Sequence, residues 1–172
     1  MMFKHYIREI IMKKSVLTGI LLSSTLLMGS EYGMFAGIEG SSDRINPDSG
    51  AKSAFEYGIG IRGGFVADNH RIYGVYNYND DLDMHTLVVA GDAMTEPYVL
   101  ADWLAGSFFI GAHAGIHDVG TLPTRPAYGV QGGMMLHFTP QVNLELGARY
   151  TASGSPAIED IEGGYVGLNV NF

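Results

Sequence analysis

Three histidines have side chains suited to catalysis or metal binding. His113 and His117 fall on one face of a predicted strand, and His137 lies on a neighbouring predicted strand. An imidazole can ligate a transition metal or act as a general base. Positions i and i+4 of a strand are about 13 Å apart, however, so one metal ion cannot bridge His113 and His117 directly. We therefore predict hydrogen-bonded structural histidines, and we expect neither a metal site nor a bound cofactor.

An acidic run, Asp80-Asp81-Leu82-Asp83, is a second candidate for ligand binding. Carboxylate oxygens are ligands that Ca²⁺ prefers. The run lacks the Gly and the terminal Glu of an EF-hand loop. We therefore predict a solvated loop tip at this position.

Six other charged side chains, three of each sign, lie on the polar faces of predicted strands: Glu39, Glu56, Arg62, Arg71, Glu145 and Arg149. Buried charges must be paired. If the polar faces point into an interior, these residues predict an internal ion-pair network. The alternative, in which Glu145 and Arg149 line a conducting path, stays open.

The strands that would position these residues show most clearly at the C-terminus. From Val166 to Phe172, apolar residues alternate with polar or small ones. Strict alternation is typical of a strand with one apolar and one polar face. The same period recurs in seven upstream segments: 32–39, 55–65, 70–79, a segment from about 85, 107–117, 128–138 and 142–151. Residues 94–103 lose the alternation and contain Pro97, which predicts a bulge or an extended turn.

The predicted connections alternate in length. Short turns near 67–69, 102–106 and 139–141 alternate with longer polar links, at 40–53, 79–84, 118–126 and 152–161. Eight strands of about ten residues, joined in this way, match a barrel that crosses a bilayer with tilted strands.

Composition agrees with a β-rich membrane protein. Glycine makes up 24 of 172 residues, charged residues only 16%, and cysteine is absent, which excludes disulfides and thiolate metal sites. Four of the ten basic residues and one of the eighteen acidic residues lie in the first thirty positions, leaving a net charge of −11 for the remainder. Such a body would repel phosphate backbones, so we expect no nucleic-acid partner.

The first thirty residues are predicted to be a secretory signal peptide. Lys13 and Lys14 precede an apolar stretch of about fourteen residues that ends in Gly29-Ser30. Met12 would be the natural start, which makes 1–11 a possible upstream extension. The mature domain would then be 31–172. An N-terminal anchor helix is the alternative.

Alternation alone does not separate a membrane barrel from a soluble β-barrel or sandwich. The many glycines on the polar face suit the crowded interior of a small barrel, and the charges there can pair with one another. After residue 31 the chain has no long apolar run, so a membrane-spanning form would have to be a closed barrel. We therefore predict an all-β, antiparallel, up-and-down transmembrane β-barrel.

The C-terminal segment also resembles a known signal. Gly167, Val170 and Phe172 match the pattern of the β-signal that the outer-membrane assembly machinery recognises, although Val166 stands where a polar residue is common. Residues 31–172 resemble the small OmpA/OmpX-type barrel family. The resemblance implies a place in the bacterial outer membrane, with lipids, lipopolysaccharide, the assembly machinery and periplasmic chaperones as partners.

Within that fold the sequence favours a non-enzymatic monomer that acts in envelope integrity or through surface contacts of loops 40–53 and 152–161. A narrow porin-like channel is the first alternative. A lipid-modifying enzyme is the second, although its nucleophile or base should lie at the lipid boundary, whereas the three histidines above fall on the polar face. A tyrosine set is expected to include membrane-interface residues: Tyr73, Tyr76, Tyr78, Tyr150 and Tyr165.

Overall fold

A computed structural model describes residues 33–47, 53–80, 82–120, 123–155 and 158–172. The predicted signal peptide lies outside the described residues. These form nine strands: β1 (Gly33–Asn46), β2 (Ala54–Ala67), β3 (His70–Asn79), β4 (Met84–Met94), β5 (Tyr98–Ala101), β6 (Leu104–Val119), β7 (Arg125–His137), β8 (Val142–Ser153) and β9 (Asp160–Asn171). The described part of the chain contains no helix long and apolar enough to cross a membrane.

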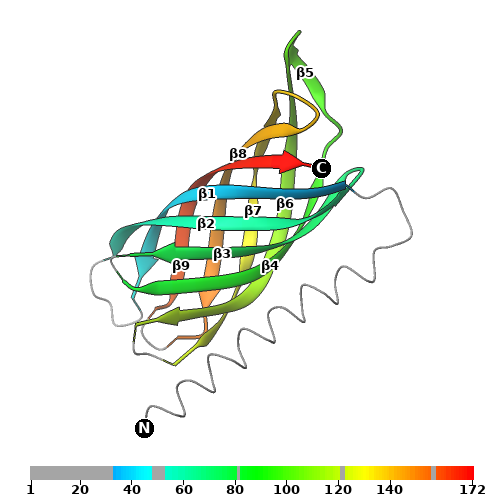
Figure 1. Cartoon of the computed structure of the whole chain (residues 1–172). Helices are drawn as coiled ribbons and strands as arrows, with labels where there is room; N and C mark the ends of the chain where they lie inside the picture. Colours follow the sequence, from blue (N-terminus) through cyan, green and yellow to red (C-terminus); the bar gives the residue numbers. More distant parts are fainter. Residues whose placement is uncertain (1–32, 48–52, 81, 121–122, 156–157) are drawn as a thin grey trace. The chain divides into compact units, whose positions relative to one another are not determined.

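Eight of the strands close into an antiparallel barrel (Figure 1). Each pairs with its neighbour in sequence, β1 pairs with β9, and β4 pairs with β6 to complete the ring. The short strand β5 pairs with β6 outside this ring. The prediction of an eight-stranded up-and-down barrel is therefore confirmed.

The first strand is longer than the sequence predicted. Residues 40–46 continue β1, so the predicted loop 40–53 is wrong over its first seven residues. Ser41 and Asp43 made this stretch look like a polar link, but both side chains are buried on the inward face of the strand. A polar residue in every second position is what a strand with a polar lumen requires.

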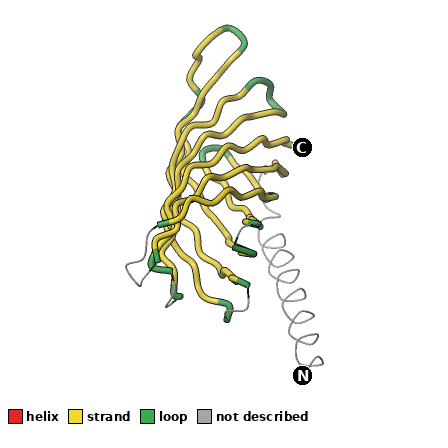
Figure 2. The backbone as a smooth tube through the Cα atoms, turned by 90° about the vertical axis from the view of Figure 1, so that its left-hand side faces the viewer, coloured by secondary structure: helices red, strands yellow, loops and turns green. Residues whose placement is uncertain are grey.

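The region around Pro97 forms an extra hairpin. After β4 ends at Met94, β5 pairs back onto β6, and its register shifts between Val99 and Ala101. The predicted irregularity is thus confirmed. The predicted turn 102–106 is too long, because β6 already begins at Leu104. The hairpin, residues 95–106, lies at the same end of the barrel as the tight turns near 68–69 and 138–141 (Figure 2). We call this end the short-turn end and the opposite end the long-link end.

The two faces of the barrel are those that the alternation predicted. Glu145 is fully buried in the lumen, whereas Ile59 and Ile110 are each 71% exposed on the outer surface. A soluble barrel would bury its apolar side chains instead. Among the tyrosines, Tyr76 and Tyr150 are exposed on the outside.

Two members of the tyrosine set lie in the lumen, not on the outer surface. Tyr73 and Tyr165 are each only 4% exposed and point into the lumen, so neither can lie at a membrane interface. Both phenols make hydrogen bonds to carboxylates there. A buried tyrosine hydroxyl needs such a partner, which the charged lumen supplies.

Candidate functional site in the barrel lumen

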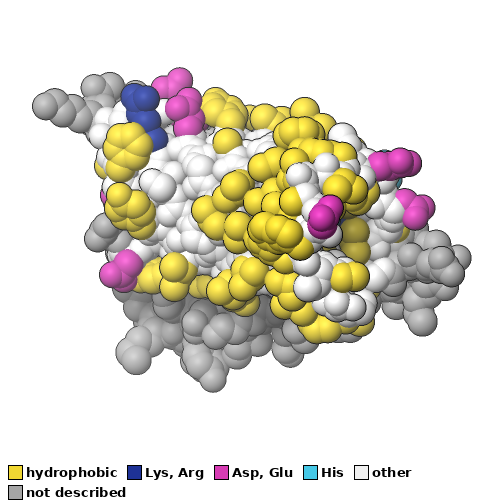
Figure 3. All heavy atoms as spheres, turned by 90° about the horizontal axis from the view of Figure 1, so that it is seen from above, with side chains coloured by type: hydrophobic (Ala, Val, Ile, Leu, Met, Phe, Trp, Pro, Cys, Tyr) yellow, Lys and Arg dark blue, Asp and Glu magenta, His cyan; other side chains and the backbone are white. Residues whose placement is uncertain are grey.

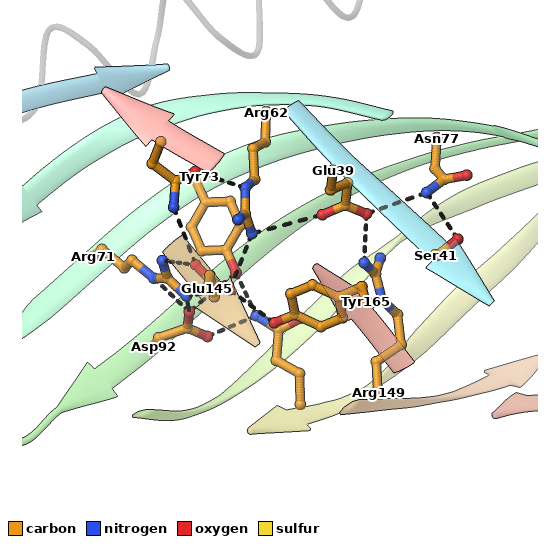
Figure 4. A network of polar contacts seen from close by, with 12 residues as sticks. Glu39, Ser41, Arg62, Arg71, Tyr73, Asn77, Asp92, Glu145, Arg149 and Tyr165 are labelled. Atoms are coloured by element: carbon orange, nitrogen blue, oxygen red, sulfur yellow. Dashed lines mark hydrogen bonds and ion pairs between the residues drawn. The ribbon is translucent and has the colours of Figure 1, made fainter. Parts of the chain in front are cut away.

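The most highly connected residue of the lumen is Glu145 on β8 (Figure 4). Its carboxylate accepts hydrogen bonds from Arg71 Nη1 at 2.5 Å and from Arg71 Nη2 at 2.9 Å. Arg62 Nη1 donates to the same group at 3.0 Å, and the Tyr165 hydroxyl at 2.9 Å. Two guanidinium groups from β2 and β3 therefore share one carboxylate.

Arg71 of β3 also connects the network to β4, the next strand of the barrel. Its Nε donates to Asp92 Oδ2 at 2.6 Å, and Tyr73 donates to the same oxygen at 3.0 Å. Gln131 Nε2 donates to Asp92 Oδ1 at 2.7 Å. The Arg71 guanidinium also lies 4.7 Å from the centre of the Tyr73 ring and 4.8 Å from that of Phe109, within cation–π range.

A second branch starts from Glu39 on β1. Its carboxylate forms an ion pair with Arg149 of β8, lies 3.6 Å from Arg62 Nη1 and accepts a hydrogen bond from Asn77 at 3.1 Å. The Arg149 guanidinium lies 4.3 Å from the centre of the Tyr165 ring. Since Arg62 contacts both carboxylates, the two branches form one network.

Five of the six charged residues singled out from the sequence meet in this network. Glu56 is also buried, but it lies six positions from Arg62 along β2, a distance of about 20 Å. It therefore belongs to a different level of the lumen, beside Asp43 on β1. The sequence prediction missed Asp92, because the end of its strand was uncertain, and so missed the third acid that balances three arginines.

The charged side chains of the network are buried between two small cavities of the lumen. Arg62, Arg71, Asp92 and Glu145 have side chains that are at most 2% exposed. A small cavity of about 110 Å³ lies on the short-turn side, lined by Arg71, and another of about 30 Å³ lies on the long-link side, lined by Arg149. The ion pairs therefore separate two chambers.

The chamber on the long-link side carries a balanced set of polar groups. Six buried polar atoms that make no hydrogen bond within the described residues line it: Asp43 Oδ1, Asn77 Oδ1, Asn79 Nδ2, His113 Nδ1, His117 Nδ1 and Arg149 Nε. Two accept, two donate and two imidazole nitrogens can do either. Such a mixture suits water, which both donates and accepts, better than an ion of either sign.

The Arg62 side chain occupies space that is free only because residue 167 is a glycine. A Cβ placed on Gly167 of β9 would overlap the Arg62 guanidinium. By contrast, a Cβ placed on Gly164, on the outer face of the same strand, would meet only the Gly147 carbonyl oxygen at 3.7 Å. The glycine of the predicted assembly signal is therefore also a packing requirement of the lumen. The other two residues of that signal, Val170 and Phe172, face outward and are 40% and 74% exposed.

The lumenal histidines bond to hydroxyl groups across strands. His113 Nε2 lies 2.9 Å from Thr151 Oγ1, His117 Nε2 lies 2.9 Å from Ser153 Oγ, and Ser107 Oγ lies 2.9 Å from His137 Nε2. These Ser–His pairs join different strands, so sequence spacing could not reveal them. Because Nδ1 of both His113 and His117 is unbonded within the described residues, no acid orients either ring as a catalytic triad requires.

His85 lies on the outer surface with polar and aromatic partners. His85 Nδ1 is 2.7 Å from the Tyr76 hydroxyl, its Nε2 is 3.6 Å from Asp83 Oδ1, and its ring packs against Tyr78 at 4.9 Å. Asp83 belongs to the acidic run, of which Asp81 lies outside the described residues. Within the described residues, no group of three acids or histidines is placed to hold a metal ion.

Comparisons with solved structures identify the fold. Neisserial surface protein A superimposes with a TM-score of 0.63 at 16% identity, over 83% of this chain and 100% of that one. Outer membrane protein H from P. aeruginosa gives 0.58 at 20% identity, over 81% and 99%. Ail, the attachment invasion locus protein of Yersinia pestis, gives 0.51 at 12% identity, over 83% and 100%.

The sequence itself is distant from characterised proteins. No family model matches the chain, and no curated protein matches it. The similarity therefore lies in the fold: the chain has the closed eight-stranded barrel of small outer-membrane proteins. This confirms the fold class and the resemblance on which the predicted location depended.

Proposed function

We propose that the protein is a non-enzymatic outer-membrane barrel with a closed lumen, which acts through its structure and its surface loops. The observation that carries this proposal is the ion-pair network across the lumen. Three arginines and three acids balance in charge, and the residues at the centre of the network are buried. A charge-balanced and buried layer of this kind offers an ion neither a net charge nor an open path.

The outer surface supports the membrane location. Large apolar side chains that would be costly in water cover the outside of the barrel, among them Ile38, Ile61 and Val89 at 59–63% exposed. We assign the short-turn end to the periplasm and the end with the longer links to the cell exterior, as in other small barrels. This placement implies the following partners: lipids, lipopolysaccharide, the assembly machinery and periplasmic chaperones. We propose that the barrel is a monomer.

The surface role draws on the external loops. One of the similar structures is a surface protein and another is an attachment invasion locus protein. The external links of this chain include the segment between β8 and β9, where Ser153 N bonds to Glu159 O and Gly154 N to Pro126 O. These bonds fasten the base of this link to the barrel.

Single-channel conductance of the folded protein in a planar bilayer tests the closed lumen. We expect no conductance steps from protein whose heat-dependent gel shift shows that it is folded. Reproducible steps that change on substitution of Arg62 or Arg149 would establish the narrow channel and refute the proposal. If no conductance is seen, increased detergent sensitivity of a strain that lacks the protein would support a role of the closed barrel in envelope integrity.

A further inference from the structure

The hairpin 95–106 exposes large apolar side chains beyond the barrel. It extends past the other turns at its end of the molecule (Figures 1 and 2). Val99 is 81%, Trp103 67% and Leu100 47% exposed. The proposed function gives no role to this segment, which needs a partner to cover its apolar surface.

One face of the hairpin continues the outer surface of the barrel. The Tyr98 ring stacks on Phe108 with centroids 5.5 Å apart, and Trp103 stacks on Phe138 at 6.3 Å. Phe108 and Phe138 are themselves exposed on the outside, at 54% and 41%. The outward face of the hairpin is therefore continuous with the surface that the proposed function places against lipid.

The side chains of β5 confirm which way this face points. A Cβ on Gly106 of β6 would lie 2.9 Å from Leu100 and 3.3 Å from the Tyr98 ring. Gly106 alternates in register with Phe108, so Tyr98 and Leu100 share the outward face. Val99 points to the opposite face.

The free edge of β5 is poorly suited to a peptide partner. In the described residues β5 pairs with β6 alone, which leaves the other edge for strand addition. The strand has only four residues, follows Pro97 closely and changes register between Val99 and Ala101. Short length, proline and bulges are the features that protect edge strands from pairing.

The residue types favour a lipid interface instead. Tryptophan and tyrosine concentrate where headgroups meet acyl chains, because each has an apolar ring and a polar group. Glu96 and Asp102 flank β5 and give the hairpin charged ends that can stay in water. Viewed from this end, hydrophobic side chains gather on the molecule with acidic side chains among and around them (Figure 3).

We propose that the outward face of the hairpin, formed by Tyr98, Leu100 and Trp103, lies in the headgroup region of the periplasmic phospholipid leaflet. It anchors the barrel there on one side only, since the other described turns at this end are short. The inference rests on the membrane placement and orientation given in the proposed function. It adds the partner that covers the outward face of this hairpin.

Trp103 is the single tryptophan of the chain, so its fluorescence reports on the hairpin alone. The experiment uses the full chain folded into phosphatidylcholine vesicles, with quenching by iodide from water and by brominated lipids from the bilayer. We expect strong lipid quenching, weak iodide quenching and a depth about 15 Å from the bilayer centre, where acyl chains meet headgroups. Efficient iodide quenching with no lipid quenching would overturn the inference.

Two variants sharpen the result. Tyr98→Ser combined with Leu100→Ser removes apolar contacts of the outward face and is expected to raise iodide quenching several-fold. Val99→Ser changes the opposite face and should leave the quenching unchanged. If Val99→Ser had the larger effect, the outward face would not be the one in lipid. Vesicle flotation and the heat-dependent gel shift separate the two proposals: a protein that fails to insert contradicts the membrane placement, whereas one that inserts with Trp103 in water contradicts only the anchor.

Discussion

Arg71 and Glu145 meet across the full width of the barrel. They are 74 residues apart in sequence, and Arg71 Nη1 lies 2.5 Å from Glu145 Oε2. Counted around the ring in the order β3, β2, β1, β9, β8, the two strands are four steps apart, which is as far as eight strands allow. A direct contact between opposite walls means that side chains bridge the lumen at this level.

Glu145→Gln is expected to destabilise the folded barrel strongly. The substitution leaves Arg62 and Arg71 buried without their shared negative charge, and breaking a buried ion pair in this way costs about 3–5 kcal/mol. The urea midpoint for loss of the folded gel band measures the effect. Some folded protein should remain, because Gln keeps one acceptor oxygen for the two guanidinium groups.

Glu162→Gln is the matched control. Glu162 lies on β9 with its side chain exposed, so the same chemical change should alter stability by no more than about 0.5 kcal/mol. Equal effects of the two substitutions would show that the charge of Glu145 contributes no special stability.

Gly167→Ala tests whether this glycine is needed for packing or only for recognition by the assembly machinery. The new methyl group would overlap the Arg62 guanidinium, and such overpacking costs about 1–3 kcal/mol. We expect the purified variant to refold less stably in detergent, where no assembly machinery is present. Gly164→Ala, three residues earlier with space for a methyl group, should refold normally.

The outcome in cells completes that prediction. Normal stability in detergent combined with poor assembly in cells would assign Gly167 to recognition alone. Reduced stability in both settings is the result that the structure predicts.

Much of the barrel could be predicted because a strand that separates lipid from a polar lumen has a period of two. That period placed Glu145 and Arg149 on the polar face and Ile110 on the apolar face, and the glycines and balanced charges of the polar face indicated that it points inward. It failed where polar residues are lumenal but look like a loop, as at Ser41 and Asp43. In this stretch the inward side chains are polar, as in the other strands. The outward residues Ser42 and Arg44 are polar too, so the alternation that marks a strand is missing.

The contacts within the lumen could not be predicted in the same way. Alternation says that Arg71 points inward, but not that it reaches Glu145 on the opposite wall. That depends on how the strands are offset as the barrel closes. Tyr73 and Tyr165 are a different case, because each lies two positions from an inward residue, Arg71 or Gly167, so alternation does place both on the polar face.

His85 offers a direct test of the non-enzymatic proposal. It is the outward-facing histidine beside Tyr76 and Asp83, and a lipid-modifying enzyme would need a base in such a position. We expect expression of the protein, and equally of its His85→Ala variant, to leave the mass spectrum of lipid A unchanged. A new lipid A species that appears with the protein and disappears with His85→Ala would show an enzyme.

Ile61→Arg and Phe55→Arg compare two depths on one lipid-facing strand. Both residues belong to β2 and point outward, with 63% and 70% of their surface exposed, and six positions separate them by about 20 Å. Ile61 lies near the middle of the strand, where an arginine in contact with lipid costs about 2–4 kcal/mol, while near the membrane interface the cost falls to about 0–1 kcal/mol. Unfolding by urea in phospholipid vesicles should therefore show a much larger loss of stability for Ile61→Arg. Two equally small losses would mean that water, rather than lipid, surrounds this face of the barrel.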